Sequence, residues 1–182
     1  MSDARADGAA PRFLADAMLG RLARWLRMLG YDTVYDPGED RGLVERAWGE
    51  GRLLLTRDTR LLRRRRLPPH LFIESDQVAV QVRQVLSALR LPAAAGPTRR
   101  CLRCNGVLEP RRKDEVAGLV PEFVWSQHQA FWRCPDCGRI YWPGTHRQRM
   151  EEALRALREG ELFERSRVRG FGSPNTPKPG GD

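Results

Sequence analysis

The residues with the most specific chemistry in this sequence are four cysteines, which form two CxxC pairs. The pairs are Cys101 with Cys104 and Cys134 with Cys137, and 29 residues separate them. A CxxC pair places both sulfurs on one tight turn, and two such turns complete a tetrahedral Zn²⁺ site. Because four thiolates saturate the ion, the pattern predicts a structural zinc that folds a segment too short and polar to build its own core.

Paired cysteines also occur as thioredoxin-like redox pairs and as disulfides. A reducing cytosol and two matched pairs argue against both of these uses. Gly106 and Gly138 follow the two pairs, at positions where a metal-binding turn needs a positive φ or a close backbone approach. The spacer exceeds the common 15–20 residues, so we expect extra residues in the hairpin between the pairs.

Acidic residues are a second set with recognisable chemistry, because they follow every predicted strand. Strands are predicted over residues 12–15, 31–35, 53–56 and 71–73, and the acids that follow them are Asp16; Asp36, Glu39 and Asp40; Asp58; and Glu74 and Asp76. The carboxyl ends of parallel strands lie on one edge of a sheet, so we expect these acids to converge. Converging carboxylates need a cation to neutralise them, and oxygen ligands favour Mg²⁺ or Mn²⁺.

Helix capping is the alternative role for these acids. Aspartate is a favoured N-cap, and both Asp16 and Asp58 precede predicted helical segments. For any single aspartate capping is the simpler interpretation, whereas acids at all four strand ends favour the metal site. Asp36 and Glu74 fit the metal site least well and are equally suited to plain loops.

An alternation of strands and helices must position these acids. Apolar residues at helical spacing predict helices over 18–29, 43–48 and 78–89, with a basic helical turn after Asp58. Strands that alternate with helices pair in parallel, so residues 12–91 are predicted to form an α/β domain with a parallel sheet flanked by helices. Residues 92–98 are predicted to be a linker. Residues 99–157 are predicted to be a small zinc ribbon that ends in a helix over 144–157.

The charge balance favours a polyanionic partner. The chain has 32 basic and 23 acidic residues, a net charge of +9, and all its basic residues except Lys113 and Lys178 are arginines. Arginine grips phosphate with two donors at once, and nucleic acid is the commonest polyanion. A genome-wide bias toward arginine and alanine would give the same excess.

Several arginines lie close to Asp58 or in the cysteine segment. We expect phosphate contacts that position RNA without reading its bases from Arg57, Arg60, Arg63, Arg64 and Arg103. A solvated helix face is the alternative for the run over 63–66. Aromatic residues can stack on bases, but the apolar periodic positions of Phe13, Trp25, Tyr31 and Trp48 favour core packing for most of them.

The overall composition is that of a globular protein. Hydrophobic residues are 41% of the 182, and 17 glycines bring the apolar share to about one half. No window approaches eighteen consecutive apolar residues, so no membrane span is predicted. Residues 1–11 carry no secretory signal and are predicted to be a disordered leader, with the cytoplasm as the expected compartment. Residues 158–182 are predicted to be a disordered tail.

Three segments resemble one known family. The segment Phe13–Asp32, FLADAMLGRLARWLRMLGYD, resembles the opening of the Mut7-C RNase domain, a branch of the PIN nuclease superfamily. Leu54–Asp58, LLTRD, resembles the second signature of that domain. The four cysteines together with Tyr141–His146, YWPGTH, resemble its C-terminal zinc ribbon and the segment that closes it. The resemblance covers about residues 12–157.

The resemblance implies a PIN-like fold and a metal-dependent ribonuclease. PIN enzymes use three or four acids at the carboxyl edge of the sheet. By position, Asp16 matches the first acid, Asp58 the acid of the Thr-Arg-Asp motif, and Asp40 the acid at the start of the second helix. Asp76 is a looser match for a fourth. PIN-type proteins often pair, so the resemblance allows a homodimer, for which the sequence itself shows no interface pattern.

These features predict hydrolysis of RNA phosphodiester bonds. Divalent ions held by Asp16, Asp40 and Asp58 would stabilise developing negative charge and activate a water, which Asp58 or Asp76 would orient. His146 is expected to start a helix or to contact RNA, and the sequence does not decide whether it takes part in catalysis. The competing interpretations are a non-catalytic RNA-binding or ribosome-associated zinc-ribbon module and a zinc-dependent interaction adaptor. Retention of both Asp16 and Asp58 favours the enzyme.

Overall fold

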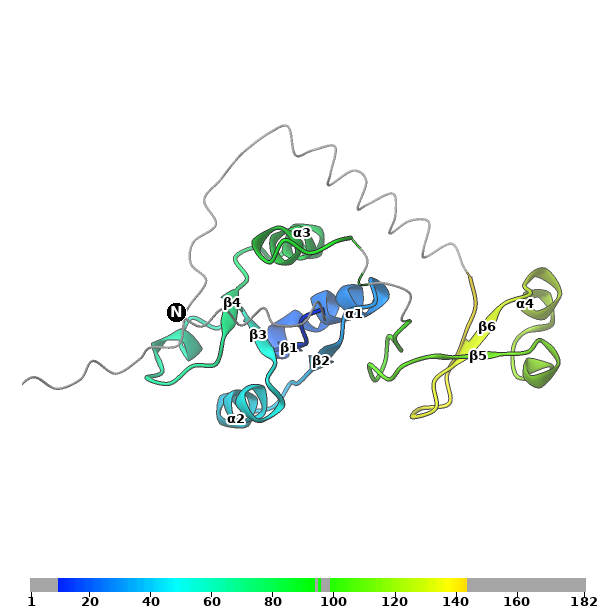
Figure 1. Ribbon diagram of the computed structural model, residues 1–182, viewed down its shortest axis with the longest axis horizontal. Helices are drawn as coiled ribbons and strands as arrows, with labels where there is room; N and C mark the ends of the chain where they lie inside the picture. Colours follow the sequence, from blue (N-terminus) through cyan, green and yellow to red (C-terminus); the bar gives the residue numbers. More distant parts are fainter. Residues whose placement is uncertain (1–9, 94, 96–98, 144–182) are drawn as a thin grey trace, which may run out of the picture.

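A parallel sheet and a smaller antiparallel sheet organise the chain (Figure 1). The computed structural model describes residues 10–93, 95 and 99–143. The parallel sheet has the strand order β2-β1-β3-β4. Its strands are β1 (Phe13–Ala15), β2 (Thr33–Tyr35), β3 (Leu53–Thr56) and β4 (His70–Phe72). The predicted mixed α/β class with a parallel sheet is therefore confirmed.

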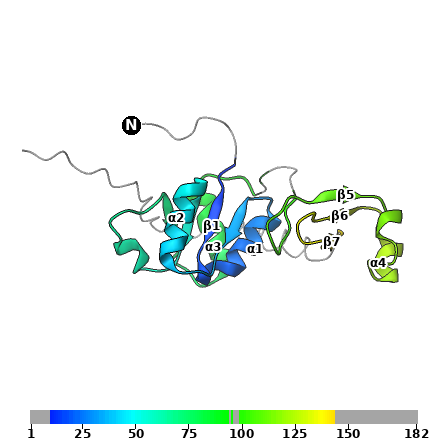
Figure 2. The same ribbon diagram turned by 90° about the horizontal axis from the view of Figure 1, so that it is seen from below.

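Helices cover both faces of the parallel sheet (Figures 1 and 2). They are η1 (Ala17–Leu19), α1 (Gly20–Met28), α2 (Asp40–Glu50), η2 (Leu61–Arg63) and α3 (Val78–Ala88). Side chains alternate between the two faces along β1 and β3, as a pleated strand requires. Phe13 and Leu55 join the core under α1 and α3, whereas Leu14 and Leu54 join the core under α2 and η2.

Helix ends explain where the observed elements differ from the predicted ones. Gly30, at φ 90°, ends α1, and the amide of Tyr31 donates to the Leu26 carbonyl. This C-terminal cap uses Tyr31, so β2 begins at Thr33 rather than at residue 31. Helix α2 begins at Asp40, three residues before the predicted start, because the helical backbone accommodates Gly42 and the first turn is polar.

The antiparallel sheet carries the ribbon, in the strand order β5-β6-β7. Its elements are β5 (Glu109–Arg111), η3 (Asp114–Val116), α4 (Glu122–Gln127), β6 (Phe131–Arg133) and β7 (Ile140–Tyr141). The expected extra residues between the CxxC pairs form η3 and α4. Within the described residues, the buried hydrophobic cluster of this sheet consists of Val116, Val124 and Phe131, and such a small core is expected for a unit that depends on a metal.

The predicted helix over 144–157, the tail over 158–182, His146 and most of the leader lie outside the described residues. Within the part of the chain that the structure describes, no helix has both the length and the apolar character needed to cross a bilayer.

Candidate metal centre and acidic strand ends

Two turns of nearly identical backbone geometry carry the cysteines. In the first knuckle, residues 101–106, the Asn105 amide donates to the Cys101 carbonyl at 2.9 Å; in the second, residues 134–139, Gly138 donates to Cys134 at 2.9 Å. Asn105 and Gly138 both have positive φ, 74° and 72°. The second knuckle therefore has the positive φ that the sequence predicts at its glycine.

The four sulfurs converge. All four Sγ atoms lie within 4.8 Å of one another. Cys101 and Cys137 are 3.5 Å apart, and Cys104 and Cys134 are 3.4 Å apart. A Zn–S bond of about 2.3 Å implies tetrahedron edges of about 3.8 Å, so the observed set approaches that size. The four cysteines are positioned to bind a metal ion, consistent with a structural zinc.

The surroundings of the sulfurs fit a cation. Burial opposes ionisation of Cys101, but hydrogen bonds from the Tyr141 hydroxyl and the Cys104 and Arg103 amides outweigh it and lower the pKa of that thiol to about 6. Burial raises the pKa of Cys104 to about 12. A divalent ion supplies the charge that lets all four thiols ionise together.

Gly106 is a position of close approach between the knuckles. A Cβ on this residue would overlap the Asp136 carboxylate and lie 3.0 Å from Cys134 Sγ. The sequence predicts either a positive φ or a close approach at this glycine, and the structure shows the close approach. The residue with positive φ in the first knuckle is the neighbouring Asn105.

Asp16 is the best-organised acid at the carboxyl edge of the parallel sheet. Its side chain is buried, with the residue 5% exposed. Oδ1 accepts the Met18 amide at 2.9 Å, which is the helix cap that the alternative interpretation predicts. Oδ2 accepts the Thr56 hydroxyl at 2.6 Å and the Arg57 amide at 2.8 Å, and these bonds tie the end of β1 to the end of β3.

Thr56 joins Asp16 to Asp58. Its Oγ1 donates to Asp16 and accepts the Asp58 amide at 3.0 Å. Asp58 Oδ1 in turn accepts the Arg60 amide at 2.7 Å. The link ends at the backbone amide of Asp58, so the structure joins the Asp16 carboxylate to the main chain of the segment that carries Asp58, at the ends of the neighbouring strands β1 and β3.

The remaining acids have separate partners. Asp40, on the first turn of α2, lies 3.5 Å from the Arg64 guanidinium. Asp36 accepts the Gly38 amide and pairs with Arg46; the Gly38 hydrogen bond is the main cause that lowers the pKa of Asp36. Asp76 is exposed. Among the described residues, the four cysteines are the group of three or more ligands close enough to share an ion, and the acids form no such group.

The predicted RNA-contacting arginines divide between two places. Arg57 follows β3 and reaches the Glu74 carbonyl at 3.4 Å, and the run over 63–66 is exposed beside Asp40. Arg103 is exposed in the first knuckle. That knuckle contacts β2, at the opposite edge of the sheet from β4 (Figure 1).

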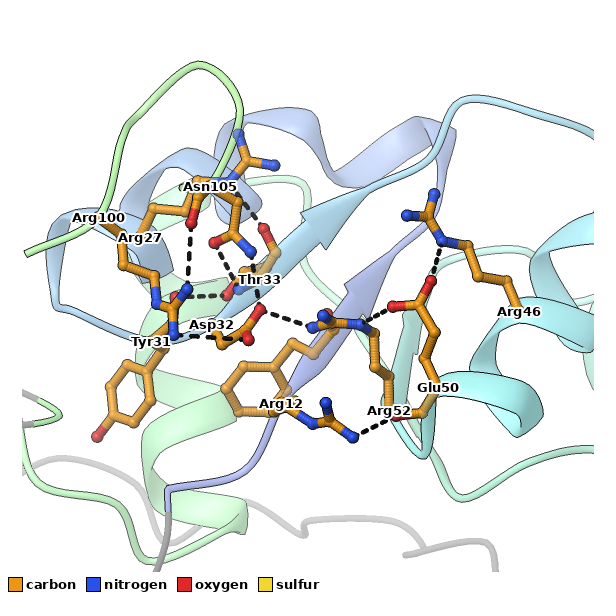
Figure 3. A network of polar contacts seen from close by, with 11 residues as sticks. Arg12, Arg27, Tyr31, Asp32, Thr33, Arg46, Glu50, Arg52, Arg100 and Asn105 are labelled. Atoms are coloured by element: carbon orange, nitrogen blue, oxygen red, sulfur yellow. Dashed lines mark hydrogen bonds and ion pairs between the residues drawn. The ribbon is translucent and has the colours of Figure 1, made fainter. Parts of the chain in front are cut away.

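Three polar residues that the sequence reasoning missed join the knuckle to the sheet (Figure 3). Asp32 pairs with Arg52 at 2.6 Å and accepts the Asn105 amide group at 2.7 Å. Arg27, 6% exposed, donates to the carbonyls of Leu102 and Arg103. The sequence does carry one signal for Asn105: it occupies the position after the second cysteine of its pair, where the other pair has Gly138, and asparagine tolerates the positive φ that this position needs.

The aromatic residues follow the core-packing expectation with one exception. Phe13 and Tyr31 are fully buried and meet edge to face, with ring centroids 5.9 Å apart. Trp25 packs against the same core. Trp48 is 50% exposed, so it lies outside the core.

Comparison with known proteins supports the assignment from the motifs. A family model of the Mut7-C RNase domain matches residues 11–154, well over half of the chain. Searches among curated proteins and among solved structures gave no match. The match includes β1 with Asp16, the Thr-Arg-Asp segment and all four cysteines. The chain therefore belongs to the Mut7-C RNase domain family.

Proposed function

We propose that this chain is a divalent-metal-dependent ribonuclease of the PIN type that hydrolyses RNA phosphodiester bonds. The family implies a nuclease-like function. The observation that carries the finer proposal is the link from Asp16 through Thr56 to Asp58. This link connects the Asp16 carboxylate to the backbone amide of Asp58, 42 positions later in the sequence, at the edge where ligand sites of parallel sheets form.

Carboxylate oxygens are the ligands that Mg²⁺ and Mn²⁺ prefer, and we propose that Asp16, Asp40 and Asp58 hold the ion. Because these acids form no group close enough to share an ion in this structure, the proposal requires their side chains to come closer together when the ion binds. The bound ion would supply charge stabilisation and a more acidic water. Thr56 and the Arg57 amide hold Asp16 in one orientation, so this carboxylate is preorganised. The Arg60 amide does the same for one oxygen of Asp58. Asp76 is the proposed fourth acid.

The arginines beside these acids support RNA as the substrate. Arg57 and Arg60 flank Asp58 in the sequence, and Arg63 and Arg64 are exposed at the start of the basic run. Arg64 lies 3.5 Å from Asp40, which brings the run next to the acidic edge. We propose that these guanidinium groups hold RNA phosphates and that the zinc ribbon, with Arg103, assists binding.

Cleavage of end-labelled single-stranded RNA by the full chain tests this proposal. We expect cleavage in Mg²⁺ or Mn²⁺, none after chelation, and a loss of at least 100-fold in D58N. D114N is the matched control, because Asp114 is an exposed aspartate on η3 in the ribbon. Metal-independent cleavage, or equal rates in D58N and wild type, would contradict the assignment.

RNA binding without cleavage, unchanged in D58N, would favour the alternative of a non-catalytic RNA-binding or ribosome-associated module. The observation that favours this alternative is that the Asp16 carboxylate caps η1 and joins β1 to β3, which are structural roles. We also propose the cytoplasm as the compartment, because a reducing environment keeps the four thiols available for zinc. A homodimer, suggested only by the family resemblance, stays a proposal that sedimentation would test.

A further inference from the structure

Among the described residues, side chains instead of another strand cover the outer edge of β2 at Thr33. β2 lies at the end of the sheet, and its inner side pairs with β1. Thr33, fully buried, directs its backbone groups to the other side: its amide donates to Asn105 Oδ1 at 3.0 Å and its carbonyl accepts Arg27 Nε at 2.7 Å. Open strand edges need such cover, and here part of it comes from the ribbon (Figure 3).

Both of these side chains depend on the first knuckle, since Asn105 belongs to it and Arg27 is bound by it. Arg27 also donates to the carbonyls of Leu102 and Arg103, at 3.1 and 3.0 Å, and both residues lie between the two cysteines of the pair. Asn105 follows the second cysteine directly, and its amide group donates to Asp32. One residue, Asn105, therefore links Cys104 to Thr33, and two residues, Leu102 and Arg27, link Cys101 to Thr33.

Comparison of the two knuckles isolates what Asn105 adds. Both have the same amide-to-carbonyl bond within the turn and the same positive φ at the residue after the second cysteine. Glycine adopts that conformation at no steric cost, and the second knuckle has glycine, Gly138, there. The asparagine side chain is therefore not needed for the turn, and its observed partners are Thr33 and Asp32 in the parallel sheet.

We infer that metal binding at the four cysteines stabilises the parallel sheet, because the metal-loaded first knuckle caps the open edge of β2 through Asn105 and Arg27. Folding of such a knuckle is coupled to metal binding. Loss of the metal then leaves the Thr33 amide and the Arg27 guanidinium without their knuckle partners, next to the strand β1 that leads to Asp16. This inference does not depend on the nuclease activity.

Amide hydrogen exchange of the full chain, measured by NMR, tests this coupling. The metal-free form is prepared by chelation and returned to buffer that contains Mg²⁺ but no zinc. The difference in exchange rate between the metal-free and the zinc-loaded protein then reports on the cysteine site alone. We expect the Thr33 amide to exchange at least tenfold faster in the metal-free protein than in the zinc-loaded protein. Unfolding of the whole sheet without zinc, seen as exchange of the central Leu54 amide, would support the same coupling.

N105G separates the cap from the metal site. It gives the first knuckle the residue found in the second, so zinc content and protection of the Gly138 amide should match wild type. Thr33 should nevertheless exchange at least tenfold faster. Equal Thr33 exchange in the zinc-loaded and metal-free wild type would overturn the inference, whatever the variant does. Unchanged Thr33 exchange in a zinc-loaded N105G would also contradict it.

Discussion

Asp16 illustrates how one carboxylate can serve two roles. It caps η1 through Met18 and fastens the end of β1 to β3 through Thr56 and Arg57. The proposed metal ligation adds to these bonds, because each carboxylate oxygen offers more than one lone pair. A substitution at Asp16 consequently changes stability as well as chemistry, and D58N is the cleaner test of catalysis.

D16N should lower the free energy of unfolding by about 1–3 kcal/mol. In either orientation of the asparagine, its NH₂ group would face a backbone N–H that now donates to the carboxylate. That N–H would lose its acceptor, and a buried donor without an acceptor costs about 1–3 kcal/mol. Urea unfolding of wild type, D16N and D114N would measure the difference. A D16N protein as stable as D114N would show that the Asp16 hydrogen bonds contribute little.

G106A should weaken zinc binding at least tenfold. The exposed Asp136 carboxylate can turn away from the added methyl group, but Cys134 Sγ would lie 3.0 Å from the new Cβ and is held in place when it binds a metal, so the methyl group would displace this ligand. Competition with a chromogenic chelator would report zinc release. G49A is the matched control, because a Cβ at Gly49 in α2 meets nothing within 4 Å. Equal zinc retention in the two variants would refute the steric argument.

At the scale of the elements, strand and helix alternation was predictable from the sequence because each strand is a short apolar run with turn residues on both sides. The placement of Asp16 and Asp58 after the neighbouring parallel strands β1 and β3 followed from that topology. The start of β2 and the length of α2 did not, because they depend on how the helix ends are capped. The contact of Asn105 with Thr33 joins residues 72 positions apart, and no local pattern encodes it.

Asp32 makes the junction between β2 and the first knuckle sensitive to acid. Burial opposes its ionisation, but hydrogen bonds from Arg52 and Asn105 and the nearby Arg100 charge outweigh it and lower the pKa of Asp32. A carboxyl whose pKa is lower in the folded state stabilises the fold above its unfolded pKa of 3.8, and the stabilisation is lost as the pH falls through the folded value.

D32N should therefore be less stable than wild type at pH 7 and lose less further stability between pH 5 and pH 3. Its stability at pH 7 falls because Arg52, 8% exposed, loses a charged partner. Urea unfolding at several pH values would measure both effects, with D114N as the exposed control. Parallel pH profiles for D32N and wild type would contradict the role given to Asp32.

At the scale of the whole molecule, the sheet unit and the ribbon are joined through the first knuckle, and the positive charge is spread over both. The exposed run over 63–66 lies beside the acidic edge, whereas Arg103 lies at the β2 edge. An RNA strand that reached both would have to pass along the sheet. The motifs predicted each unit, but only the structure shows which edge of the sheet the ribbon occupies.

R63A should reduce the salt dependence of RNA binding. Loss of one phosphate contact to a single strand should flatten the plot of log binding constant against log salt concentration by about 0.7. R41A is the control, because Arg41 is an exposed arginine of α2 that pairs with Glu45. Fluorescence anisotropy between 50 and 200 mM salt would give the slopes. Equal slopes for R63A and wild type would remove Arg63 from the RNA path.

The central claim is that the acids at the carboxyl edge hold a divalent cation, and the most direct measurement is Mn²⁺ binding followed by electron paramagnetic resonance. The zinc-loaded full chain, D58N and D114N would be titrated in turn. The account predicts a Mn²⁺ site in wild type and D114N that D58N weakens at least tenfold. Equal Mn²⁺ affinity in all three proteins, or no Mn²⁺ binding by wild type with and without RNA, would contradict it.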